Sequence, residues 1–241
     1  MKGRCASPAK RVLERRSLRL AAAAQRRFLV DCYAMVLAYH LILSAYGFWL
    51  PNDQRGSWSE FVRAYELAAF GPATKTNTRR SVAGRRFEPS QRAAMQAALA
   101  RQPVVFDGRQ ARAIAIGFAG YVGRSMVPVH ACAIMPDHVH LIVGRFRLSI
   151  ERTCEQLKGA ATAQLNREGI HPFADVHYRN GRTPTPCARK GWWVYLDSAA
   201  HVRRSIRYVN ENPVRAGLRP QRWSFVTPYE RCEEGTLRVT R

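Results

Sequence analysis

The segment 135–143, which reads Met-Pro-Asp-His-Val-His-Leu-Ile-Val, constrains the fold of this chain more than any other. Its Pro-Asp pair favours a turn, and the apolar run that follows has the composition of a buried strand. In a strand, residues two apart point to the same face of the sheet. His138 and His140 are therefore predicted to share one face, while Val139 points into a core on the other. A second apolar run at 127–134 precedes the turn, so the two runs predict an antiparallel hairpin.

Two imidazoles on one face of a strand can bind a single divalent metal ion. Such a site needs a third protein ligand and an open position for a substrate. An isolated His-x-His pair is common, so an incidental or structural pair is the alternative interpretation. The turn before the pair, the apolar run after it and the basic character of the chain favour the metal site.

A helix is predicted over residues 199–212, with an Asp-Ser pair as its N-terminal cap and Pro213 at its end. Its apolar residues recur at helical spacing, and a separate polar stripe beside them consists of His201, Ser205, Tyr208 and Asn212. These two residues are one turn apart on one face, so a phenol that can attack and an amide oxygen that can bind metal are presented together. The alternative is an amphipathic helix whose tyrosine packs at the core edge and whose asparagine caps the C-terminal end.

The chain is strongly basic. It has 39 Lys and Arg residues against 17 Asp and Glu residues, a formal net charge of +22. The first 34 residues contain nine basic and two acidic side chains, and the remainder still has a net charge of +15. A charge of this size favours a polyanionic partner, most commonly nucleic acid, over a protein that is merely soluble and basic.

The cysteines and the apolar segments indicate the cellular compartment. None of the six cysteines forms a Cys-x-x-Cys pair, so neither a zinc knuckle nor a disulfide framework is predicted, and a reducing cytoplasm fits best. The apolar stretch 29–50 is interrupted by Asp31 and His40, which favours a buried strand over a membrane span. We therefore expect a cytoplasmic protein with no membrane association.

The chain is expected to form one domain with appendages. The predicted division is a basic N-terminal extension at 1–34, either disordered or upstream of the native start, a domain at 35–230 with an excursion at about 52–90, and a C-terminal tail at 231–241. Further helices are predicted at 91–101, 110–124 and 149–168, the last of them capped by Ser149, and further strands at 104–106 and 192–196.

The histidine and tyrosine motifs, in this order, resemble those of a known enzyme family. Residues 136–143 resemble the His-hydrophobe-His motif of HUH endonucleases. Residues 208–217, Tyr-Val-Asn-Glu-Asn-Pro-Val-Arg-Ala-Gly, resemble the tyrosine motif of single-tyrosine transposases, closest to the REP-associated tyrosine transposases. Residues 39–43 are similar to the first strand of that family, and residues 223–226 to its C-terminal pattern. The basic extension is not part of the family pattern, and the excursion is longer than a minimal member needs.

The resemblance implies an α+β fold, in which a central antiparallel sheet is flanked by helices in a ferredoxin-like layout. It implies that His138, His140 and Asn212 bind a divalent metal ion and that Tyr208 is the nucleophile. Mixed nitrogen and oxygen ligands together with phosphate chemistry favour Mg²⁺ or Mn²⁺. A phenol is a poor nucleophile at neutral pH, and the metal ion would polarise the phosphate that it attacks.

The resemblance also implies the substrate and the reaction. The enzyme would be a DNA transposase that cleaves and rejoins single-stranded DNA, often at hairpin ends, as a monomer or homodimer associated with the nucleoid. Attack by Tyr208 would give a 5′-phosphotyrosine linkage and a free 3′-OH, so that a second DNA end can be joined without ATP. The basic residues expected to hold the DNA backbone are Arg79, Arg80, Arg85, Arg86, Lys158 and Arg204.

Three alternatives remain open at the level of the sequence. The first is another HUH nuclease, such as a replication initiator or relaxase. The second is a catalytically inactive or domesticated, sequence-specific DNA-binding protein. The third is an unrelated basic RNA-binding protein with an incidental His-x-His. Metal-dependent covalent capture of DNA distinguishes the enzyme from the readings in which the protein only binds nucleic acid.

Overall fold

The computed structural model describes residues 36–50, 65–71 and 88–229. The chain divides into two compact units, 1–36 and 37–241, and the described residues belong almost entirely to the second. The predicted extension, the C-terminal tail from residue 231 and most of the excursion lie outside them. The elements are β1 (Ala38–Ser44), the 3-10 helix η1 (Tyr65–Phe70), α2 (Pro89–Ala97), α3 (Gly108–Ser125), β2 (Val129–Ile134), β3 (His138–Gly144), α4 (Ile150–Arg167), β4 (Trp192–Leu196) and α5 (Ala199–Arg215).

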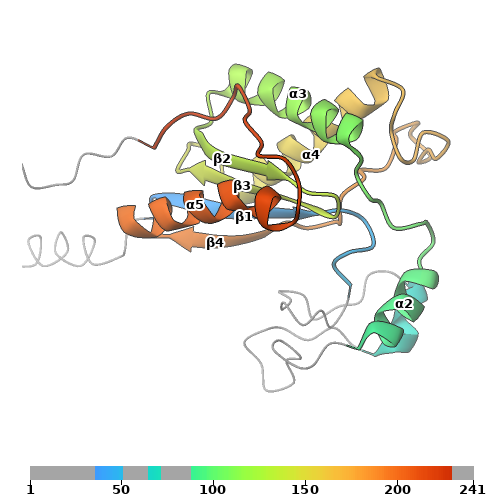
Figure 1. The fold of residues 1–241 in the computed structure, drawn as a ribbon. Coiled ribbons are helices and arrows are strands. Elements are labelled where there is room, and N and C mark those ends of the chain that lie inside the picture. Colours follow the sequence, from blue (N-terminus) through green and yellow to red (C-terminus); the bar gives the residue numbers. More distant parts are fainter. Residues whose placement is uncertain (1–35, 51–64, 72–87, 230–241) are drawn as a thin grey trace, which may run out of the picture. The chain divides into compact units, whose positions relative to one another are not determined.

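The second unit has an α+β fold built on a four-stranded antiparallel sheet with the order β2-β3-β1-β4 (Figure 1). The predicted hairpin is confirmed as β2 and β3, and the turn between them is short. Strand β1 pairs with β3 on one side and with β4 on the other, in both cases antiparallel. The chain thus forms two strand-helix-strand units, β1-α3-β2 and β3-α4-β4, and in each unit another strand lies between the two that are connected.

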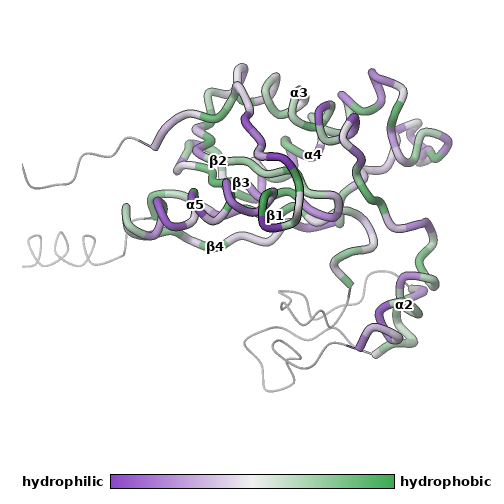
Figure 2. The backbone as a smooth tube through the Cα atoms, viewed as in Figure 1, coloured by the Kyte–Doolittle hydropathy of each residue, from purple (hydrophilic) through white to green (hydrophobic). Residues whose placement is uncertain are grey.

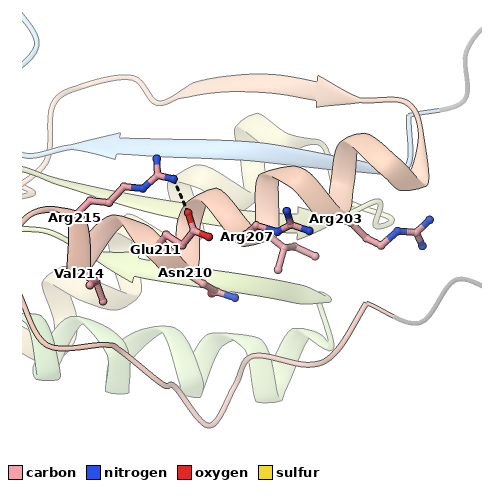
Figure 3. A pocket seen from close by; sticks show the side chains of 7 residues that line it. Arg203, Arg207, Asn210, Glu211, Val214 and Arg215 are labelled. Atoms are coloured by element: carbon pink, nitrogen blue, oxygen red, sulfur yellow. Dashed lines mark hydrogen bonds and ion pairs between the residues drawn. The ribbon is translucent and has the colours of Figure 1, made fainter.

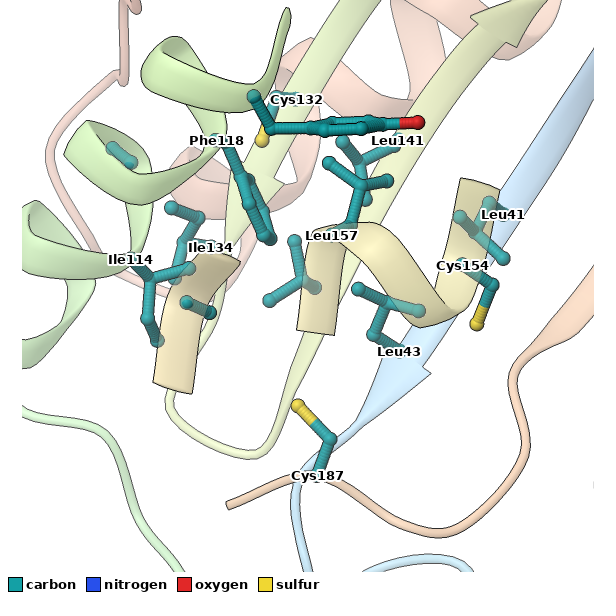
Figure 4. Packing of buried hydrophobic residues seen from close by; sticks show 14 of the residues in the cluster. Leu41, Leu43, Ile114, Phe118, Cys132, Ile134, Leu141, Cys154, Leu157 and Cys187 are labelled. Carbon is teal, nitrogen blue, oxygen red and sulfur yellow. The ribbon is translucent and has the colours of Figure 1, made fainter. Parts of the chain in front are cut away.

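The two faces of the sheet are covered by different helices. Helices α3 and α4 pack together on one face, and α5 packs on the other (Figure 1). The α3/α4 face holds the larger core, in which Leu41, Phe118 and Leu157 are almost fully buried (Figure 4). The α5 face holds a smaller cluster that includes Val202 and Val209 of the helix. Figure 2 shows green, hydrophobic stretches along the central strands, as expected for strands covered on both faces, whereas β4 at the edge is pale.

Side chains at the helix starts explain where the helices begin. Ser149 and Ser198, the predicted caps, accept backbone hydrogen bonds at the starts of α4 and α5. Helix α3 begins two residues earlier than predicted because Asp107 and Gln110 form a reciprocal capping box. No helix among the described residues is long and apolar enough to cross a membrane.

Two predictions about local structure are wrong. Pro213 does not end α5, which continues to Arg215, because a proline removes a hydrogen bond to the preceding turn and leaves the residues after it free to be helical. The helix stops after Arg215 because Gly217 has a φ of 73°, which allows the Leu218 amide to donate to the Pro213 carbonyl at 2.8 Å. Residues 104–106 form no strand: the amides of Val104 and Phe106 donate to carbonyls of the loops that follow β1 and precede β3.

Candidate functional site

His138 and His140 both lie on the face of the sheet that α5 covers. The Nε2 atoms of their imidazoles are 2.9 Å apart. Val139, between them, belongs to the core on the opposite face. The alternation predicted for the His-x-His pair is therefore present in the structure, and the two rings converge on one point.

A third imidazole, from His40 of β1, extends this pair. In the register of β1 and β3, His40 pairs with Ile142 and Ile42 pairs with His140, so the two histidines are diagonal neighbours on one face. The Nε2 atom of His40 lies 2.9 Å from the Nδ1 atom of His140. In the sequence, His40 stands out only as an interruption of an apolar stretch. A strand pairing between residues 100 apart is what places it in the site.

The carboxylate of Asp137 lies next to His138, on the side away from His140 and His40. The Oδ1 atom of Asp137 lies 2.6 Å from the Nδ1 atom of His138. Because a carboxylate can only accept, Nδ1 of His138 donates and its Nε2 faces His140. The order of the row is therefore Asp137, His138, His140 and His40, which we call the histidine row.

Burial keeps the inner imidazoles neutral. The pKa of His140 is lowered from 6.5 to about 2, first by burial and then by the charges of His138 and His40. The pKa of His40 is lowered to about 4, first by burial and then by His138 and His201. Neutral imidazole is the form found in metal sites, so neither ring has to give up a positive charge before an ion binds at physiological pH.

Tyr208 of α5 lies against the histidine row. Its ring centroid is 5.8 Å from that of His40 and 5.7 Å from that of His140, in both cases edge to face. A pocket of about 380 Å³ lies at this point, and the side chain of Tyr208 is 44% exposed. The pocket is lined by His40, Ile42, His140, His201, Arg204, Ser205 and Tyr208. Three members of the predicted polar stripe of α5, at positions 201, 205 and 208, therefore face the histidines.

The remaining residues predicted to bind metal or DNA do not all lie in this pocket. Asn212 is half-buried, one turn beyond Tyr208, and does not line the pocket. Arg204 does line it. Lys158 is only 6% exposed, and its ammonium group donates to the Ala188 carbonyl at 2.6 Å, so this cation serves the protein interior. The four arginines predicted at 79, 80, 85 and 86 lie outside the described residues.

The facing Nε2 atoms of His138 and His140 fit a metal ion as adjacent ligands. Two nitrogen ligands at about 2.1 Å and at right angles around a metal ion are about 3.0 Å apart, close to the 2.9 Å between these atoms. Each ring also has a partner on its other nitrogen, as metal-binding histidines usually do. Within the described residues, no three His, Cys, Asp or Glu side chains surround one point as a metal site. The three histidines lie in a row and do not surround one point, so they do not form such a site by themselves.

The outer face of α5 carries a second concavity, of about 650 Å³, lined by Arg203, Ile206, Arg207, Asn210, Glu211, Val214 and Arg215. Figure 3 shows its side chains along the helix, with Arg215 paired to Glu211 at 2.5 Å. Basic side chains thus extend along α5 from the pocket at Tyr208 to the outer face of the helix.

The sequence matches no protein-family model, and a search of curated proteins finds no match.

Proposed function

We propose that this chain is a single-tyrosine nuclease of the HUH type, which cleaves and rejoins single-stranded DNA as a transposase does. The observation that carries the proposal is the position of Tyr208, whose ring lies 5.7 Å from His140 in one pocket. The phenol and the His-x-His pair come from elements far apart in the sequence. A chance tyrosine on an amphipathic helix would have no reason to face the two histidines.

The topology supports the same proposal. Two interleaved strand-helix-strand units with the sheet order β2-β3-β1-β4 correspond to the ferredoxin-like layout that the resemblance implies. Adjacent positions on β1 and β3 carry the histidines, and α5 follows β4 directly to cover them. Both motifs belong to one chain, so the arrangement is compatible with a monomer whose tyrosine acts in its own site.

His138 and His140 would hold a divalent ion, Mg²⁺ or Mn²⁺, and Asn212 is the proposed third ligand. When bound, such an ion withdraws charge from the phosphate and stabilises the charge that develops during attack. The chain itself supplies the nucleophile: the Tyr208 oxygen forms a bond to phosphorus, and the bond from phosphorus to the 3′ oxygen breaks. The phenol loses its proton and the 3′ oxygen gains one. Attack by a 3′-OH on the phosphotyrosine reverses these steps and joins a DNA end.

The charge of the pocket suits a nucleic acid substrate. Arg204 lines the pocket beside Tyr208, and it can hold a phosphate next to the scissile one. Arg207 and Arg215 continue the basic surface along the outer face of α5. A single strand can follow such a surface because its backbone carries one negative charge per nucleotide.

Denaturing gel electrophoresis of the full chain with labelled single-stranded hairpin DNA and Mn²⁺ tests the proposal. The hairpin is taken from the DNA that flanks the gene. We expect a labelled, protein-sized adduct that requires the metal ion and disappears in Tyr208→Phe. Tyr195→Phe is the matched control, because Tyr195 is 55% exposed and points to the opposite face of the sheet, beside Tyr39. That variant should form the adduct as the wild type does.

Two results would contradict the proposal. Binding of the hairpin with no adduct and no cleavage would indicate a DNA-binding protein without catalytic activity. An adduct that persists in Tyr208→Phe would show that another side chain is the nucleophile. Comparison of the hairpin with a nicked origin sequence separates a transposase from a replication initiator or relaxase.

A further inference from the structure

The hydrogen bonds of the histidine row restrict where its protons can lie. Nδ1 of His138 donates to the Asp137 carboxylate, so in a neutral ring its Nε2 carries no proton. His140 Nε2 must then donate across the 2.9 Å to His138 Nε2. His140 Nδ1 in turn must accept from His40 Nε2. Without a metal ion, the three neutral rings therefore donate in one direction, from His40 toward the carboxylate.

This arrangement conflicts with metal binding by His140. A histidine nitrogen that binds a metal ion offers its lone pair and cannot carry a proton. The proton on His140 Nε2 must therefore move to Nδ1, which then needs an acceptor. Of the contacts described for His140, only the one with His40 Nε2 involves Nδ1.

We propose that His40 is the positioning residue of the metal site: it accepts the Nδ1 proton of His140 and holds that ring in the tautomer that can bind the ion. This inference rests on the proposed function, since it assumes that His138 and His140 bind a metal ion. The hydrogen bond between His40 and His140 reverses its direction when the site is filled. Each of the two rings moves one proton from Nε2 to Nδ1, and no proton is released overall.

The position of His40 suits this role. It comes from β1, and its ring lies at 5.0 Å from the His140 ring and 5.8 Å from the Tyr208 ring. Its Nε2 is directed at His140 Nδ1 and not at the point between the two metal-binding nitrogens. His40 therefore acts through His140 and is not itself a ligand.

Calorimetric titration of the full chain with Mn²⁺ at pH 8 tests this role without DNA and without catalysis. Loss of a partner of this kind weakens metal binding by roughly 10- to 100-fold, so we expect that loss in His40→Leu, and affinity within about threefold of wild type in His40→Gln, whose amide oxygen can accept. His130→Leu is the matched control, because His130 lies on β2 and contacts the Thr227 carbonyl. Its Mn²⁺ affinity should not change.

A second measurement uses the unaltered protein, so it does not depend on how a variant folds. Long-range ¹H–¹⁵N spectra of the imidazoles, recorded with and without Mg²⁺, report which nitrogen carries each proton. We expect His40 to be protonated at Nε2 without the ion and at Nδ1 with it, and His140 to change in the same way.

The outcomes separate this inference from the proposed function. Wild-type Mn²⁺ affinity in His40→Leu, or a proton that stays on His40 Nε2 in the saturated protein, overturns the role of His40 and leaves the nuclease proposal intact. Metal binding with the expected tautomer change but no DNA adduct supports the role of His40 and overturns the nuclease proposal. A wild-type chain that binds no Mn²⁺ overturns both.

Discussion

The two faces of the sheet are made by the same strands but contain different chemistry. Along β3, Val139 and Leu141 point to the α3/α4 face, whereas His138 and His140 point to the α5 face. The first face is filled by large apolar side chains with almost no exposure. The second combines a smaller apolar cluster, which includes Ala131, Ala133 and Ile142, with the histidine row and the pocket at Tyr208.

This difference between the faces indicates how one domain can contain a buried polar site, although burial of polar groups lowers its stability. Burial of imidazoles lowers stability unless they are paired, and apolar burial contributes about 25 cal/mol per Å² of surface removed from water. Concentration of the apolar area on the α3/α4 face leaves α5 free to present polar side chains. We therefore expect substitutions on the first face to change stability and substitutions on the second to change chemistry.

The largest effect is expected in the α3/α4 core. Phe118 is 1% exposed and packs edge to face on Phe225. Phe118→Ala should lower the free energy of unfolding by about 3–5 kcal/mol, because it removes apolar contacts and leaves a cavity. Ser205→Ala, in the pocket on the other face, should change it by no more than about 0.5 kcal/mol. Urea denaturation compares the two, and equal losses would remove the distinction between the faces.

The next effect is a dependence of stability on pH that comes mainly from the α5 face. Between pH 6.5 and pH 4, an unfolded chain binds protons at His40 and His140 that the folded chain excludes, because burial lowers both pKa values, to about 4 and about 2. The free energy of unfolding should therefore fall as the pH is lowered from 7 to 4, by on the order of 2–3 kcal/mol for His40 alone.

A third histidine separates the contributions of the two faces. His171 accepts from the Phe173 amide next to the large core, and burial lowers its pKa to about 4. His171→Gln should reduce the pH dependence of the free energy of unfolding and leave Mn²⁺ affinity unchanged, whereas His40→Leu should alter both quantities. Denaturation curves at pH 7 and pH 4.5 measure the pH dependence of stability. A wild-type stability that does not change between these pH values would contradict the prediction.

Features that depend on neighbouring residues were predictable from the sequence. The alternation of β3, the Ser149 and Ser198 caps and the polar stripe of α5 each depend on a period or on a spacing of a few residues. The position of His40 was not predictable in this way, because it requires the register between β1 and β3. The end of α5 was misplaced because Pro213 is compatible with the last turn, and Gly217 supplies the stop.

Lys158 shows that the sequence also does not reveal which charged side chains are accessible to a ligand. A lysine in a basic chain suggests contact with nucleic acid, but α4 carries this one into the interior, where its ammonium group bonds the Ala188 carbonyl. Arg204, with the same formal charge, lies in the pocket on the other face. Sequence composition cannot separate them, since only the packing of each helix decides which cation is available to a ligand.

The smallest expected effects come from this pair of cations, and their contrast is the most specific test of the division between the faces. Arg204→Ala should weaken the binding of single-stranded hairpin DNA and lower the slope of log affinity against log salt by about 0.7, the share of one phosphate contact. Lys158→Met keeps most of the aliphatic chain but leaves the Ala188 carbonyl without its donor, so it should cost about 1–3 kcal/mol of stability. Its salt slope should equal that of the wild type. Salt titrations of DNA binding, paired with urea denaturation, measure both quantities for both variants. A reduced slope in Lys158→Met would mean that the ammonium group leaves its buried position to meet the DNA, and the α3/α4 face would then take part in binding.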